Sequence, residues 1–110
     1  MHRSEFVREL KVAVPEAVEA LKGYRDSLTM EMLAFTTLAQ GAIKTGDLGV
    51  VRRCFSFAHE VWSRGNREVR NALVVAFLED LDFTGPDGER AEQLLTTELR
   101  LERRAVLAYL

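Results

Sequence analysis

The sequence predicts an all-α fold, with a single compact helical domain of about five to six helices spanning residues 1–110. Apolar residues recur three and four positions apart along most of the chain, which is the period of an α-helix. Residues that cap or end helices, mainly Ser, Asp, Asn and Gly, separate these segments. A composition of 47% hydrophobic and 29% charged residues, with a formal net charge of -2, is typical of a globular domain and not of a disordered chain. We therefore expect antiparallel helix hairpins around one core.

The N-terminal segment is expected to form two helices separated by Pro15. Ser4 belongs to a residue type that caps helix N-termini, and Leu10 and Val14 continue the apolar face of the first helix. Proline lacks an amide hydrogen and disfavours a helical conformation at the preceding residue, so the chain should break there. The second helix is short and should end near Gly23.

Two longer helices should follow as a hairpin. The first begins after Ser27 and ends at Gly46, and the second is capped by Asp47 and ends at Gly65. Asn66 is then a suitable N-cap for the next helix. Each helix carries a broad apolar arc, which indicates contact with more than one neighbour.

The segment 66–82 is expected to be the central helix, because residues 72–78 are apolar all round. A buried strand is disfavoured, since no Gly or Pro turn bounds this run. Residues 84–88 give the strongest loop signal in the chain, and Asp87 is expected to cap the last helical region. Threonines at 96–97 would break that region in two.

The rarer residues point away from catalysis. Cys54 lies in an apolar stretch and is interpreted as a small buried hydrophobe. His2 and His59 have no second histidine at metal-ligand spacing, and Ser56 lies inside a helix without an oxyanion hole. We expect no enzymatic activity, no metal and no cofactor.

Nucleic acid, membrane and export are also disfavoured. A net charge of -2 gives no general attraction to nucleic acid, and a helix-turn-helix over 47–82 would present an apolar second helix to the groove. The longest apolar run, 72–78, is far shorter than the roughly 20 residues that span a bilayer. The N-terminus has no apolar leader segment and the cysteine is alone, so we expect a cytoplasmic protein.

The charges are strongly segregated along the chain. Residues 44–70 hold six basic and three acidic side chains, a local +3, whereas residues 79–92 hold six acids against Arg90, a local -5. The candidate partner-binding residues are these acids: Glu79, Asp80, Asp82, Asp87, Glu89 and Glu92. An acidic surface of this kind would dock a basic protein partner. The alternatives are a solvated loop, or neutralisation by Arg90 or by the C-terminal arginines Arg100, Arg103 and Arg104.

The stretch 47–83 contains Asn71-Ala72, an apolar run and then Leu-Glu-x-Leu-x-Phe up to Phe83, and the pair Leu94-Leu95 follows the next loop. This pattern resembles a family of short bacterial all-helical proteins of mostly unassigned function, some of which are similar to immunity proteins of toxin systems. The resemblance implies a non-catalytic cytoplasmic protein that binds a cognate toxin domain, with the acids at 79–82 facing a basic cleft.

The leading hypothesis is therefore an immunity protein that neutralises a bacterial toxin by occlusion. The alternative is a repeat-like or self-associating helical scaffold. Residues 38–47 look like the turn of a tetratricopeptide-type repeat. The apolar girdle of the central helix, together with apolar C-terminal side chains, would supply a homodimer surface. These side chains are Val106, Leu107, Tyr109 and Leu110.

Overall fold

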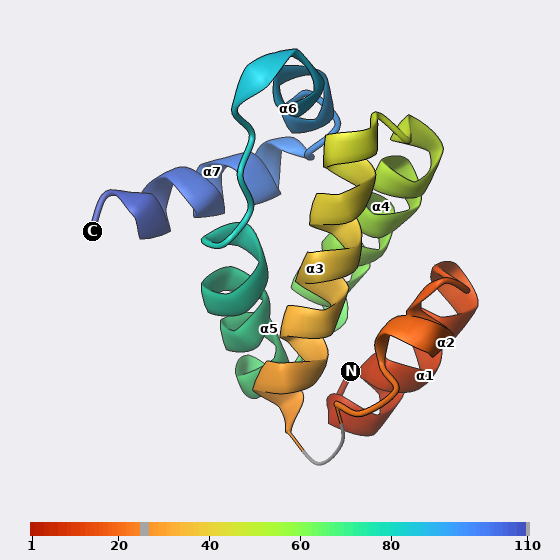
Figure 1. The fold of residues 1–110 in the computed structure, drawn as a ribbon. Coiled ribbons are helices and arrows are strands. Elements are labelled where there is room, and N and C mark those ends of the chain that lie inside the picture. The colour runs from red at the N-terminus through yellow and green to blue at the C-terminus, as the bar shows by residue number, and fades with distance from the viewer. Residues whose placement is uncertain (25–26, 110) are drawn as a thin grey trace.

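The computed structural model describes residues 1–24 and 27–109, and within them it contains seven α-helices, one π-helical segment and no strand. The order along the chain is α1 (Arg3–Ala13), α2 (Ala17–Ala20), α3 (Leu28–Thr45), α4 (Leu48–Arg64), α5 (Arg67–Leu73), η1 (Val74–Leu78), α6 (Gly85–Glu92) and α7 (Thr97–Leu107) (Figure 1). The predicted all-α single domain is confirmed. The helix number exceeds the expected five to six because the break before Thr97 divides the last helical region into α6 and α7.

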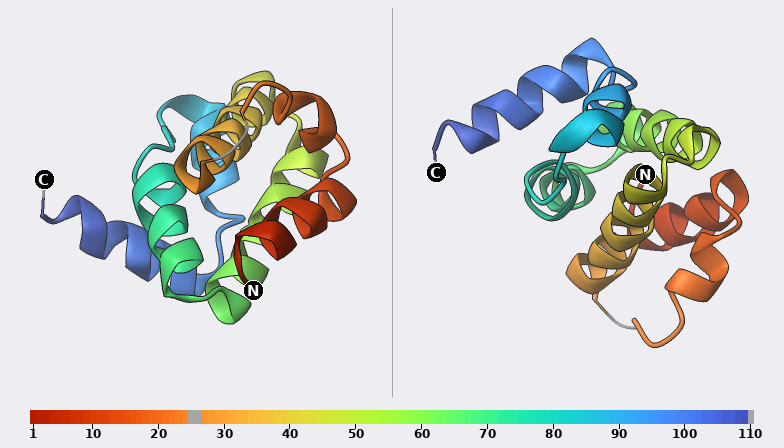
Figure 2. Two further views of the ribbon diagram at one scale, coloured as in Figure 1. Left: turned by 90° about the horizontal axis from the view of Figure 1, so that it is seen from below. Right: turned by 45° about the horizontal axis from the view of Figure 1, so that its top comes forward.

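The helices pack around α3, which contacts α2, α4, α5, η1 and α6. The predicted hairpin is the α3–α4 pair, and α1 and α2 cover one side of it while α5 and η1 cover the other (Figure 1). In the second half of the chain α7 crosses η1, and its C-terminal end extends away from the other helices in both views of Figure 2.

The core contains a continuous chain of aromatic contacts that uses all six phenylalanines of the protein. Ring centroids of neighbouring pairs lie 4.5 to 6.5 Å apart. The closest pair is Phe35 of α3 stacked on Phe77 of η1, with an interplanar angle of 12°. The chain of contacts runs through Phe6, Phe57, Phe35, Phe77, Phe55 and Phe83. It therefore joins α1, α3, α4, η1 and the segment before α6.

Several predicted helix ends are confirmed. The side chains of Ser27, Asp47 and Asn66 each accept a hydrogen bond from the backbone amide three residues later. Gly46 ends α3 with a φ of 72°, a conformation that favours glycine. The break at Pro15 is also present, between α1 and α2.

Other helix ends differ from the prediction. The cap of α1 is His2 instead of Ser4, because the His2 ring accepts from the Glu5 amide while the Glu5 carboxylate accepts from the His2 amide. Gly65 has an extended conformation, with φ -65° and ψ 143°, and does not end α4 in the left-handed conformation. Asp87 does not cap the last region, since α6 already begins at Gly85 and Asp87 lies in its first turn.

The predicted continuous helix over 66–82 is replaced by α5 followed by η1, which ends at Leu78. The Thr36 hydroxyl of α3 lies 2.5 Å from the Ala76 carbonyl, which an α-helix would offer to the amide four residues later. The Glu79 amide, whose α-helical acceptor would be Val75, donates to Val74, five residues back, at 3.0 Å. A side chain on another helix thus occupies the carbonyl that would accept from the Asp80 amide, which accounts for the end of the regular helix at Leu78. Val75 is 55% exposed, so the run is not buried on every side.

The packing of α6 on the preceding segment depends on Gly88. A methyl group on its Cα would lie well inside van der Waals contact with the backbone carbonyl of Phe83. We expect Gly88→Ala to lower the free energy of unfolding by about 1–3 kcal/mol, measured by urea denaturation. The matched control is Gly41→Ala, since Gly41 lies in α3 with open space around it. The control should raise stability by about 0.5–1 kcal/mol. Equal stability of the Gly88 variant and the natural chain would contradict the close approach of α6 to residue 83.

A second prediction concerns the ion pair between Glu16, at the start of α2, and Arg53 of α4. The Arg53 guanidinium donates to both carboxylate oxygens, at 2.8 and 2.7 Å, and these hydrogen bonds lower the pKa of Glu16 from 4.5 to about 2. A carboxyl group with a lowered pKa in the folded state stabilises the fold above the unfolded pKa, and this contribution is lost as pH falls toward the folded pKa.

We therefore expect Glu16→Gln to lower the urea midpoint at pH 7, with the difference from the natural chain shrinking between about pH 4.5 and pH 2. The effect should be small, because both side chains are about 40% exposed. Glu19→Gln, which removes a more exposed pair with Lys22 on the same short segment, is the control and should change the midpoint less. A constant difference at all pH values would show that the ion pair is not its source.

Candidate protein-binding surface

The structure separates the six acidic residues predicted as a binding site. Asp80, Asp82 and Asp87 line two adjoining pockets along α3. Glu92 pairs with Arg103 of α7 at 3.4 Å. Glu79 and Glu89 line neither of these two pockets. Half of the predicted set therefore converges on one surface.

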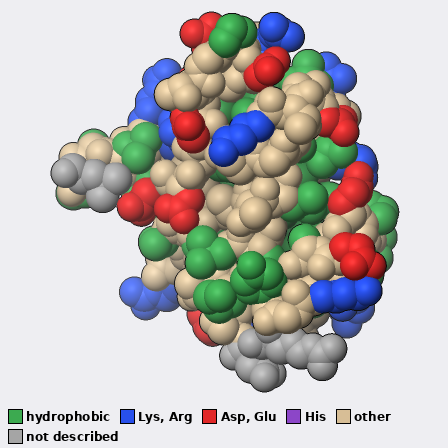
Figure 3. Space-filling model, viewed as in Figure 1, with side chains coloured by type: hydrophobic (Ala, Val, Ile, Leu, Met, Phe, Trp, Pro, Cys, Tyr) green, Lys and Arg blue, Asp and Glu red, His purple; other side chains and the backbone are tan. Residues whose placement is uncertain are grey.

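We call the two adjoining pockets the α3 groove. The first has a volume of about 420 Å³, and Asp80 lines it opposite one face of α3. The α3 residues of this pocket are Leu33, Thr36, Thr37, Gln40, Gly41 and Lys44. The second has a volume of about 220 Å³ and shares Gln40 and Lys44 with the first. It extends along Asp82 to the first turn of α6 and includes Asp87. In the view of Figure 3, apolar side chains gather over the lower parts of α3 and α5, with acidic side chains above them to the left.

Gln40 joins the two sides of the groove, which are α3 and the segment around Asp82. Its side-chain amide donates to the Asp82 carbonyl at 3.0 Å and accepts from the Asp82 amide at 2.7 Å. The Asp82 carboxylate in turn accepts a hydrogen bond from the Thr84 amide at 2.9 Å, which lowers the pKa of Asp82. Asp82 is therefore ionised and fixed in orientation, and part of its role is to shape the turn before α6.

The groove is acidic overall. Its lining contains the carboxylates Asp80, Asp82 and Asp87 against one cation, Lys44, which gives a net charge of -2. Asp87 lies 3.7 Å from Arg90 on the same helix, an exposed pair of little strength. Asp80 has no cation within 4.0 Å among the residues that the structure describes.

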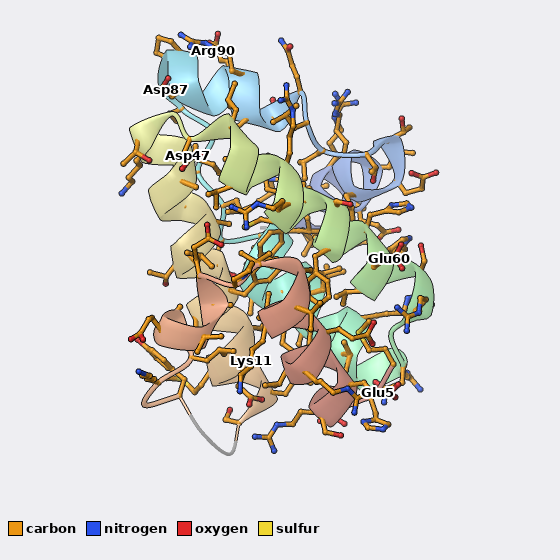
Figure 4. The ribbon with its side chains drawn as sticks, turned by 90° about the vertical axis from the view of Figure 1, so that its right-hand side faces the viewer. Glu5, Lys11, Asp47, Glu60, Asp87 and Arg90 are labelled. Atoms are coloured by element: carbon orange, nitrogen blue, oxygen red, sulfur yellow. The ribbon has the colours of Figure 1, made fainter. Side chains whose placement is uncertain are left out.

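Figure 4 places the acidic end of the groove at a corner of the molecule. Asp87 and Arg90 lie on α6, and Asp47 lies below them where α3 turns into α4. A methyl group on Gly46 would come within 3.4 Å of the Asp87 carboxylate. The α3–α4 corner and the start of α6 therefore form one continuous edge of this surface.

Arg103 neutralises the end of η1, which was one of the alternatives left open by the sequence. Its guanidinium donates to the carbonyls of Leu78 and Leu81 at 3.1 and 3.0 Å. It also lies 4.8 Å over the ring of Phe83 and pairs with Glu92. This cation occupies the negative end of the helix, where the acids at 79–82 would otherwise be unfavourable. Arg100 instead donates to the last carbonyls of α6 and the turn after it.

The cysteine thiol and the second histidine have structural surroundings. Cys54 is fully buried, as predicted, and burial raises the pKa of its thiol to about 12. The His59 ring lies 3.2 Å from the hydroxyl of Thr96, the N-cap of α7. Among residues 1–24 and 27–109, no three His, Cys, Asp or Glu side chains are grouped to hold a metal ion. No helix of this part of the chain is both long and apolar enough to cross a membrane.

Sequence reasoning missed the contribution of α3 to the groove. Thr37, Gln40 and Lys44 were not among the candidate site residues, although their spacing of three and four places them on one face of α3. This polar face could have been recognised from the sequence as a candidate surface. Its position beside residues 80–88 depends on the tertiary fold and could not.

Comparison with known proteins finds one family. No curated protein and no solved structure matches the chain. Residues 7–109, nearly the whole chain, match DUF7674, described as a domain of unknown function, and the protein therefore belongs to the DUF7674 family.

Proposed function

We propose that this protein is a non-catalytic protein-binding domain that docks a basic segment of a partner protein in the α3 groove. The observation that supports this proposal most directly is the convergence of Asp80, Asp82 and Asp87 on one groove with a net charge of -2. Complementary charge of this kind speeds association and selects the partner.

The other end of the groove favours an apolar side chain beside the basic one. Leu33 lines the first pocket and is half-buried, and Met30, one turn earlier on the same side of α3, is 42% exposed. A partner segment with an aliphatic side chain next to Lys or Arg would therefore match both ends of the groove.

The specific form of the proposal is an immunity protein that neutralises a cognate bacterial toxin by occlusion in the cytoplasm. What supports it is the resemblance of the stretch 47–83 to a family of mostly unassigned function, some members of which are similar to immunity proteins, together with an acidic groove that would face a basic toxin cleft. The protein would then act by covering the toxin and would perform no chemistry of its own.

A second candidate is a self-associating scaffold, for which the observation is the extended α7. Leu101 is 58% exposed and Tyr109 is 92% exposed, while Val106 and Leu107 are half-buried. Leu110, also assigned to this surface from the sequence, lies outside the described residues. Sedimentation velocity distinguishes the two candidate functions. A protein that is strictly monomeric at micromolar concentration would contradict the self-associating scaffold.

The test of the immunity proposal uses the product of the neighbouring gene. Co-expression of the two proteins should relieve the toxicity of that product, and the purified proteins should bind. We expect Asp80→Asn/Asp87→Asn to slow association several-fold at low salt and much less at high salt, because salt screens exposed charges. Stopped-flow fluorescence measures this rate. Asp82 is kept because it shapes the turn before α6.

Glu89→Gln/Glu98→Gln is the matched control, since it removes the same charge from exposed positions that do not line the groove. Its association rate should stay close to that of the natural protein. If both variants slow binding equally, the groove is not the contact. If co-expression leaves toxicity unchanged, the immunity function is wrong even where binding occurs.

A further inference from the structure

A second surface, of opposite charge, lies where α4 meets α5. A pocket of about 250 Å³ is lined by Trp62 at the end of α4 and by one face of α5. The α5–η1 residues of this pocket are Arg67, Arg70, Asn71 and Val74. We call these five residues the Trp62 patch. None of them lines the α3 groove.

The two arginines of the Trp62 patch differ from several other arginines of the described residues in having no ion-pair partner there. Arg53, Arg64 and Arg103 each have a carboxylate within 4.0 Å. In the part of the chain that the structure describes, neither Arg67 nor Arg70 has one. They are three residues apart on one helix, so their like charges are neighbours and repel each other. A carboxylate placed between them would remove that repulsion.

Trp62 holds Arg70 in position for such a contact. The guanidinium carbon of Arg70 lies 4.3 Å from the centroid of the indole ring. An arginine stacked on an aromatic ring keeps its N–H donors available for a carboxylate, and it loses less side-chain freedom when the carboxylate binds. Trp and Arg are also the residue types that most often dominate the energy of protein interfaces.

The surroundings of the arginines define what lies beside the carboxylate. Trp62 and Val74 are half-buried, and each leaves an apolar surface in the pocket. Asn71 adds a side-chain amide on the same face of α5. A ligand that carries a negative charge alone would leave the apolar part of the patch uncovered.

From this geometry we infer that the Trp62 patch binds an acidic segment of a protein partner, with Glu or Asp on Arg67 and Arg70 and an adjacent apolar side chain against Trp62 and Val74. This surface has the opposite sign to the α3 groove and different residues. Its assignment is independent of the function proposed above, and either could fail without the other.

The test uses Trp62 as a reporter, because it is the only tryptophan in the chain. The probe is a terminally blocked hexapeptide, Gly-Leu-Glu-Glu-Phe-Gly, titrated into the full-length protein. We expect a saturable change in tryptophan fluorescence and a shift of the indole N–H resonance. The matched peptide with Gln in place of both Glu residues should bind at least about tenfold more weakly.

Arg67→Gln/Arg70→Gln should weaken binding of the acidic peptide by about tenfold or more. The matched control is Arg52→Gln/Arg104→Gln, which removes the same charge from exposed positions outside the patch and should bind as the natural chain does. Circular dichroism verifies that each variant is folded.

Three results would overturn the inference. They are the absence of saturable binding, equal affinity for the Glu and Gln peptides, and equal weakening in the two double variants. A tryptophan signal that depends on protein concentration alone and disappears in the Arg67/Arg70 variant would instead identify a second copy of this chain as the occupant.

Discussion

Phe35 determines which side of α3 is turned into the protein. Its ring contacts those of Phe6, Phe57 and Phe77, with centroids 6.5, 5.8 and 4.5 Å away. Ring pairs of this kind contribute about 0.5–1.5 kcal/mol each beyond the burial of their surface. Because an α-helix turns about 100° per residue, fixing Phe35 inward places the polar face around Gln40 outward. The α3 groove follows from this core, since its floor is that outward face.

The helices that local chemistry specifies were predictable, and those that depend on distant contacts were not. Ser27 and Asp47 cap their helices through the next turn of the chain, so the sequence alone contains the signal. The regular helix ends at η1, where the Thr36 hydroxyl contacts the Ala76 carbonyl from 40 residues away in the sequence. The hydrophobic pattern of residues 72–78 contains no sign of that contact. The sequence therefore predicted a helix that extends to residue 82.

The candidate site was likewise predictable only in part. Counting charges revealed the run of acids at 79–92, but not which of these acids line the groove and which are neutralised elsewhere. Arg103 reaches the end of η1 and Glu92 only because α7 crosses η1. Arg90, Arg100 and Arg104 were equal alternatives in the sequence, since helix crossing decides which cation arrives. Gln40 fixes Asp82 through another contact of this kind, 42 residues apart in the chain.

The two surfaces differ in how each is prepared for a partner. The α3 groove has a floor on an 18-residue helix and a wall held by Gln40 and Arg103, so little backbone would have to be ordered on binding. The Trp62 patch is prepared through a side chain, because the indole ring restrains Arg70. Both arrangements reduce the entropy lost on association. The formal net charge of -2 conceals them, since the charge of -2 in the groove and that of the two arginines in the patch cancel in the total.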